Sequence, residues 1–82
     1  MFTQDLFEEL NILSLYNLES MQEGIKIHST ASPAMVAAAA RLFEKGITSQ
    51  IDGGYLTLRG QEAAEHVKAV LGLLSSPHRA DT

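Results

Sequence analysis

The segment from Ser32 to Gly46 constrains the fold more than any other part of this sequence. Ser32 is a favourable N-cap, and Pro33 suits the first helical position because its missing N–H would be unpaired there anyway. The body is rich in alanine, and Gly46 suits the position after a helix end. A helix is therefore predicted over residues 33–45. Its expected inward stripe is Val36, Ala39, Ala40 and Phe43, with Met35 and Leu42 beside it, and its expected outward face is Ala34, Ala37, Ala38, Arg41 and Lys45.

Turn-forming residues directly after this helix indicate a β-hairpin. Residues 47–51 alternate between apolar and polar, residues 52–54 are Asp-Gly-Gly, and residues 55–58 favour extended structure. Glycine readily adopts the positive φ that tight hairpin turns require. The pattern predicts a hairpin over residues 47–58.

An amphipathic helix is predicted on each side of this central unit. The first runs from Thr3, a candidate N-cap, to Tyr16. The second can be capped by Thr57 and ends near Ser75, and its apolar stripe is expected to comprise Ala63, Val67, Val70, Leu71 and Leu74. Gly60 is costly inside a helix, so it indicates close packing against a neighbouring segment.

Residues 20–28 are compatible with two structures. Residues 20–23 match the capping-box spacing of a short helix, whereas residues 24–28 alternate like a strand. We expect a turn or short helix followed by a brief extended stretch. Residues 77–82 are polar and aperiodic and are expected to form a disordered tail, which leaves residues 1–76 as a single domain.

The composition predicts a cytoplasmic homodimer. The chain has no cysteine, which is typical of proteins in a reducing compartment, and its first residues lack a signal-peptide pattern. The longest apolar run, Ala34 to Ala40, is too short to span a bilayer. With two tyrosines, three phenylalanines and no tryptophan, the core is poor in large side chains, so association of two copies would bury more surface.

Neither catalysis nor metal binding is predicted. His28, His66 and His78 are far apart, and only Glu62 and His66 have a helical i, i+4 spacing. We therefore expect no enzyme activity, no metal and no cofactor. At most, His28 would add a pH-dependent charge to the middle of the chain.

The order of elements resembles a known class of domains. The series from Lys45-Gly46-Ile47 through the hairpin to Leu56-Thr57-Leu58-Arg59-Gly60 resembles bacterial winged helix-turn-helix domains. The whole chain, with Gln-Glu-Gly-Ile-Lys and Asp-Gly-Gly-Tyr-Leu-Thr, also looks like a small uncharacterised bacterial family described at most as DNA-binding. The resemblance implies an α+β, winged-helix-like fold in which helix 33–45 is the recognition helix and hairpin 47–58 the wing. It further implies a dimeric DNA-binding protein, such as a small transcriptional regulator.

The charge distribution limits how such a protein could bind double-stranded DNA. The net charge is −4, made up of −5 over residues 1–23, +2 over residues 24–59 and −1 over the remainder. The candidate DNA contacts in the basic middle are Lys26, Arg41, Lys45 and Arg59. Four contacts fall below the roughly six to ten of tight binders, so a dimer would be required. Asp52 at the wing tip would repel phosphate.

A second hypothesis is a winged-helix-derived interaction module without DNA binding. It would pair through the N-terminal helix and the apolar outer side of the last helix. Its acidic N-terminal face would contact a protein partner.

Overall fold

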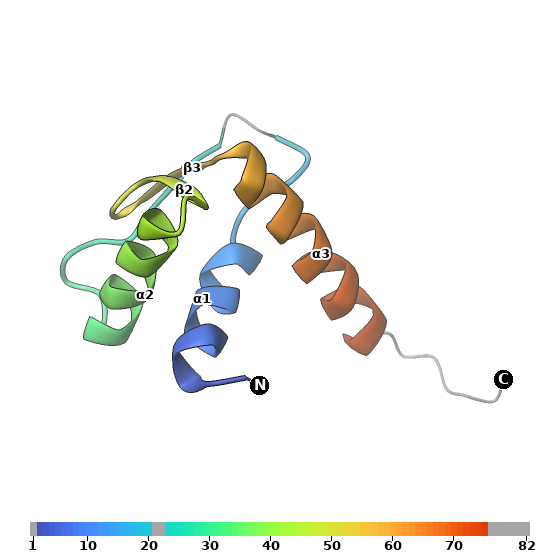
Figure 1. Ribbon diagram of the computed structural model, residues 1–82, viewed down its shortest axis with the longest axis horizontal. Coiled ribbons are helices and arrows are strands. Elements are labelled where there is room, and N and C mark those ends of the chain that lie inside the picture. The colour runs from blue at the N-terminus through green and yellow to red at the C-terminus, as the bar shows by residue number, and fades with distance from the viewer. Residues whose placement is uncertain (1, 21–22, 76–82) are drawn as a thin grey trace, which may run out of the picture.

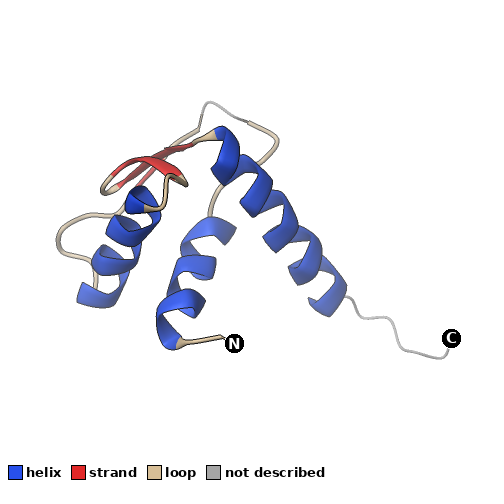
Figure 2. Ribbon diagram, in the orientation of Figure 1, coloured by secondary structure: helices blue, strands red, loops and turns tan. Residues whose placement is uncertain are grey.

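The computed structural model of the protein describes residues 2–20 and 23–75. Within these residues the chain forms three helices and a three-stranded antiparallel sheet, which confirms the predicted α+β class (Figure 2). In chain order the elements are α1 (Gln4–Ser14), β1 (Ile25–Lys26), α2 (Pro33–Glu44), β2 (Thr48–Gln50), β3 (Gly53–Leu56) and α3 (Leu58–Ser75).

The arrangement is compatible with a winged helix. Helix α1 packs against both α2 and α3, and the small sheet lies at one end of the helices (Figure 1). The strand order is β1-β3-β2, so the hairpin that follows α2 takes the place of a wing. Residues 27–32, between β1 and α2, contain a turn closed by the Ala31 N–H and the His28 carbonyl, and no helix. The helix that precedes the recognition helix in a helix-turn-helix motif is therefore absent from this segment.

Side-chain caps fix where the helices begin. The hydroxyl of Thr3 accepts a hydrogen bond from the Leu6 N–H at 3.1 Å, and that of Ser32 accepts one from the Met35 N–H at 3.2 Å. Thr57 plays the same part before α3, where its hydroxyl accepts the Gly60 N–H at 3.0 Å. The three predicted caps are confirmed, because each satisfies a backbone donor that the first helical turn leaves free.

Gly53, Gly54 and Gly60 allow backbone conformations and close contacts near the hairpin that other residues would not. The turn of the hairpin is formed by residues 51–52, and Gly53 and Gly54, predicted as part of the turn, instead begin β3. Their φ values of 121° and 75° lie in the region that favours glycine. A β-carbon on Gly60 would overlap the carbonyl oxygen of Ile47, so only glycine lets α3 approach β2 this closely. The close packing predicted for Gly60 is confirmed.

The core is small and lies between the three helices. Among the described residues, its buried apolar members are Ile12, Leu13, Tyr16, Ala38, Ala39, Leu42 and Ala64. Three of these are alanines, which makes the core poor in buried volume. The Tyr16 hydroxyl donates a 3.0 Å hydrogen bond to the Gly54 carbonyl and ties α1 to the sheet.

The predicted inward face of α2 is partly wrong. Ala38, expected on the outside, is fully buried, whereas Val36 and Phe43, expected inside, are 38% and 42% exposed. On this helix, Arg41 and Lys45 lie on the side that faces α1, where they pair with the buried Glu9 carboxylate.

The remaining local predictions have mixed outcomes. Helix α1 ends at Ser14, with Leu15 as its C-cap, two residues before the predicted end. The extended stretch predicted within residues 24–28 is the short strand β1, while residues 21–22 and the predicted tail at 77–82 lie outside the described residues.

Candidate functional site

Two surfaces could carry a function: the basic residues near α2 and an apolar groove between α1 and α3. The basic residues are organised around Glu9, whose side chain on α1 is only 5% exposed. One carboxylate oxygen of Glu9 accepts from Arg41 Nε and the other from Lys45 Nζ, both at 2.5 Å. Arg41 Nη2 also donates to the Asp5 carbonyl at 3.2 Å and lies 3.9 Å from the Asp5 carboxylate. Two cations thus face two carboxylates, and their charges cancel locally.

The pKa values of this Glu9 cluster reflect the pairing. Burial raises the pKa of the Glu9 carboxyl, but hydrogen bonds and the charges of Lys45 and Arg41 outweigh burial and hold it below its usual value. The hydrogen bond from Arg41 to Glu9 in turn raises the pKa of the guanidinium. Both shifts favour the charged forms of Glu9 and Arg41, so this ion pair is fully charged at neutral pH.

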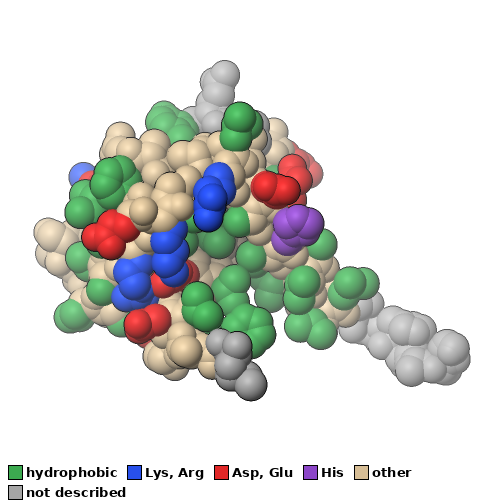
Figure 3. All heavy atoms as spheres, viewed as in Figure 1, with side chains coloured by type: hydrophobic (Ala, Val, Ile, Leu, Met, Phe, Trp, Pro, Cys, Tyr) green, Lys and Arg blue, Asp and Glu red, His purple; other side chains and the backbone are tan. Residues whose placement is uncertain are grey.

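The four predicted DNA contacts do not form one free basic surface. Lys26 pairs with Asp52 at 3.1 Å and lines a hollow with Val36, Ala39 and Ala40, on a different side of α2 from Arg41. Arg59 is exposed and, among the described residues, is the only one of the four without an ion-pair partner. Lys and Arg side chains gather on one face of the molecule, but acidic side chains lie between and around them (Figure 3).

The exposed side of α2 offers little that could read DNA bases. Pro33, Ala37 and Glu44 are exposed along it, and none carries a hydrogen-bond donor in its side chain. Glu44 would also be repelled by phosphate. A recognition helix normally presents donors or acceptors to the major groove, and this helix instead directs its two bases toward α1.

The second surface is an apolar groove of about 340 Å³ between α1 and the C-terminal half of α3. Its apolar walls, called the α1–α3 groove below, are Phe2, Phe7 and Leu10 on one side and Val67, Val70, Leu71 and Leu74 on the other. The two helices diverge away from the sheet, so the groove opens toward the N-terminus of α1 (Figure 1). Asn11, Ser14 and His66 supply its few polar atoms.

The α3 side of this groove is the apolar stripe that the sequence predicts for the last helix. At its start, Ala63 and Val67 pack against the core beside the buried Ala64. Further along, Val70 is 54% exposed and Leu74 is 78% exposed. Helix α3 has 18 residues and α1 has 11, so α1 is too short to cover it. The sequence signal for this surface is the unusually wide apolar sector of the first helix together with Phe2.

The α1–α3 groove is lined mainly by apolar side chains. Within residues 2–20 and 23–75, no three His, Asp or Glu side chains come together as metal ligands. His66 lies in the groove wall next to apolar side chains. Such an arrangement suits binding through apolar contact.

Fold and surface together define a small α+β domain with a winged-helix-like arrangement and an open apolar groove. The chain belongs to DUF5669, a family of unknown function, whose model matches residues 1–75. No curated protein and no solved structure matches the chain. None of the helices in the described part of the chain is long and apolar enough to cross a membrane.

Proposed function

We propose that the protein is a homodimeric interaction module whose α1–α3 groove binds the same groove of a second copy. The observation that carries this proposal is the exposure of an apolar stripe on α3, opposite the exposed rings of Phe2, which precedes α1, and Phe7 on α1. Phe2 is 77% exposed, Phe7 55% and Leu74 78%. Contiguous exposed apolar side chains of this size usually mark a contact with another molecule.

A second copy is the occupant that fits the groove. Five apolar side chains that line it, Phe2, Phe7, Val70, Leu71 and Leu74, are between 44% and 78% exposed, and a second copy would offer the same apolar surface in return. The polar side chains at the groove edge contribute further area. Because a two-fold interface joins one patch to itself, the same groove supplies both halves.

The small core supports the same conclusion. In this chain of 82 residues, three of the seven buried apolar residues in the described part are alanines, so burial within one copy contributes little. Pairing two grooves would bury Phe7, Val70 and Leu74 from each copy. Association would then contribute to stability as well as to function.

Sedimentation equilibrium of matched variants tests the proposal. Leu74→Glu places a charge in the groove, whereas Leu58→Glu makes the same change at an 83% exposed leucine in the first turn of α3, outside the groove. We expect a wild-type dimer at tens of micromolar, a dimer dissociation constant at least about tenfold higher for Leu74→Glu, and no change for Leu58→Glu. A monomeric wild-type protein at several hundred micromolar would refute the proposal, as would equal effects of the two substitutions.

DNA binding by the dimer is the second candidate function, and the winged-helix-like strand order supports it. With Lys26, Arg41 and Lys45 paired to acids, Arg59 is the candidate phosphate contact left free on each copy. Binding to a mixed duplex library should then be weak and should fall only shallowly with salt. Arg59→Gln is the informative variant, because substitutions at Arg41 or Lys45 would also break the Glu9 cluster. Tight binding that is unchanged in Arg59→Gln would contradict this assignment of the contacts.

A further inference from the structure

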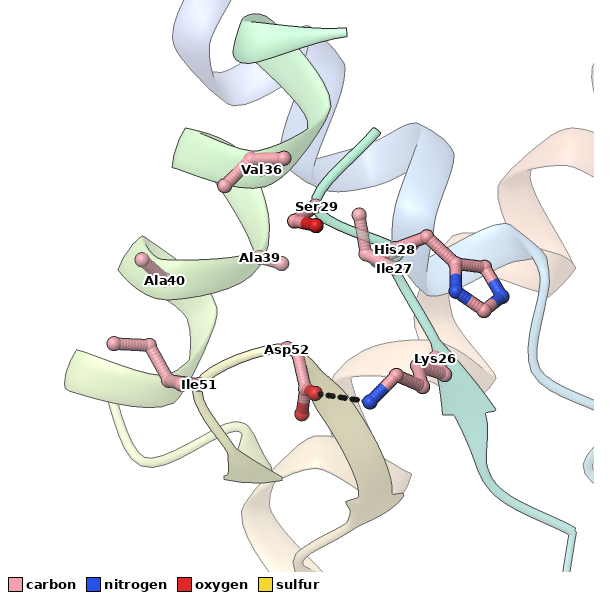
Figure 4. A pocket seen from close by; sticks show the side chains of 9 residues that line it. All are labelled: Lys26, Ile27, His28, Ser29, Val36, Ala39, Ala40, Ile51 and Asp52. Atoms are coloured by element: carbon pink, nitrogen blue, oxygen red, sulfur yellow. Dashed lines mark hydrogen bonds and ion pairs between the residues drawn. The ribbon is translucent and has the colours of Figure 1, made fainter. Parts of the chain in front are cut away.

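A hollow lies on the other side of α2, away from both the Glu9 cluster and the α1–α3 groove. It has a volume of about 340 Å³ and is enclosed by the end of β1 with the loop that follows, by α2, and by the β2–β3 turn (Figure 4). This volume is near the lower limit of pockets that bind small molecules. Any ligand would therefore be small.

One side of the hollow is apolar. Val36, Ala39 and Ala40 of α2 line it together with Ile51 of the hairpin turn. The short alanine side chains leave the space open, and the exposed parts of Val36 and Ile51 offer apolar contact. A branched aliphatic or aromatic side chain would be desolvated there.

The opposite side carries one charge of each sign. Lys26 Nζ and Asp52 Oδ2 are 3.1 Å apart, and Figure 4 shows the two side chains pointing toward each other. Their side chains are 65% and 35% exposed, so both stay within reach of a ligand, and an exposed pair of this kind is easily opened. Ser29 adds a hydroxyl near the apolar wall, whereas the His28 ring points away from α2.

We propose that this hollow binds a free α-amino acid with an apolar side chain. The carboxylate of the amino acid would pair with Lys26 and its ammonium group with Asp52. Each charge of the ligand and of the protein would then lie next to a charge of opposite sign, which is electrostatically favourable. The side chain of the ligand would lie against Val36, Ala40 and Ile51. A fatty acid could pair with Lys26 but would leave Asp52 without a new partner, and a simple amine could pair with Asp52 but would leave Lys26 without one. An amino acid carries both charges, so the site should bind it more tightly than either of these compounds.

Titration of isotope-labelled wild-type protein followed by amide chemical shifts tests the proposal without any mutation. The probes are L-leucine and L-phenylalanine. The comparison compounds are 4-methylpentanoate, which lacks the ammonium group, and 3-methylbutylamine, which lacks the carboxylate. We expect saturable shifts at Ser29, Ala39 and Ala40, with a dissociation constant of about 0.1–1 mM for at least one amino acid and at least about tenfold weaker binding of the comparison compounds. Absence of saturable shifts with both amino acids, or equal binding of either comparison compound, would overturn the proposal.

A pair of variants then locates the site. Ala40→Leu fills the hollow, and Ala37→Leu adds the same atoms on the exposed side of α2 outside it. We expect Ala40→Leu to weaken amino-acid binding at least about tenfold and Ala37→Leu to leave it unchanged. Equal affinities for the two variants, with both shown to be folded by circular dichroism, would place the binding elsewhere and contradict the proposal.

Discussion

Removal of the Glu9 charge is expected to destabilise the fold by about 2 kcal/mol. Loss of one partner from a buried ion pair costs about 3–5 kcal/mol, because the remaining charge is left without compensation. Here the Arg41 side chain is 27% exposed and that of Lys45 is 47% exposed, so both can regain water when Glu9 is replaced by glutamine. The amide oxygen can also keep one hydrogen bond, which lowers the cost further.

Thermal unfolding of Glu9→Gln measures this effect. For a chain of this length, about 2 kcal/mol corresponds to a decrease in Tm of roughly 8–16 °C. Glu44→Gln is the matched control, because it removes the same charge from an exposed position on α2 and should change stability by less than about 0.5 kcal/mol. Since the folded-state pKa of Glu9 lies below its ordinary value of 4.5, its contribution is complete above that pH and is lost as the pH falls through the folded-state pKa. The difference between wild type and Glu9→Gln should therefore shrink below about pH 4.5. A Tm for Glu9→Gln equal to that of Glu44→Gln would refute the stabilising role of the cluster.

Two further predictions concern the packing of α3 and of α1. Gly60→Ala should destabilise the protein by more than about 3 kcal/mol, because the added β-carbon would overlap the Ile47 carbonyl oxygen. Gly72→Ala should stabilise it by up to about 1 kcal/mol, because no neighbouring atom lies within 4 Å of the added β-carbon. Similar melting curves for the two variants would contradict the close packing at Gly60. Burial raises the pKa of Tyr16 to about 12, so wild-type stability should fall as the pH rises above the ordinary value of 10, where the unfolded chain ionises first. Tyr16→Phe removes the hydrogen bond to the Gly54 carbonyl and should lower the free energy of unfolding by about 1 kcal/mol at pH 7. It should also remove the alkaline decrease in stability, which melting curves between pH 7 and pH 11 would show. An unchanged alkaline decrease in this variant would contradict the assignment to Tyr16.

Local features of the fold could be predicted from the sequence because short-range chemistry determines them. The hydroxyls of Thr3, Ser32 and Thr57 cap the helices as expected, and the predicted hairpin forms, with Gly53 and Gly54 at positive φ where β3 begins. Each of these effects involves residues only a few positions apart. Their outcome hardly depends on the rest of the chain.

The candidate site could be predicted only in outline. The sequence suggests pairing through the first and last helices, but which apolar residues stay exposed depends on contacts between distant residues. Periodicity predicts an apolar stripe on α2, but the buried side of the helix includes Ala38 and faces α1, where Arg41 pairs with Glu9, 32 positions away. Likewise, the sequence predicts the apolar stripe on α3. Leu74 nevertheless stays exposed, because the facing helix α1 is too short to cover the C-terminal half of α3. Whether an apolar stripe packs into the core or stays exposed for a partner therefore depends on which elements of the fold cover it.

The most direct test of the proposed function is an isotope-filtered NOE experiment on an equimolar mixture of labelled and unlabelled protein. The filter retains only contacts between different copies, so it reports the interface itself. If two α1–α3 grooves face each other, contacts between copies should join the Phe7 ring to the methyl groups of Val70, Leu71 and Leu74. The absence of contacts between copies at millimolar concentration, or contacts that fall only on residues outside the groove, would contradict the account.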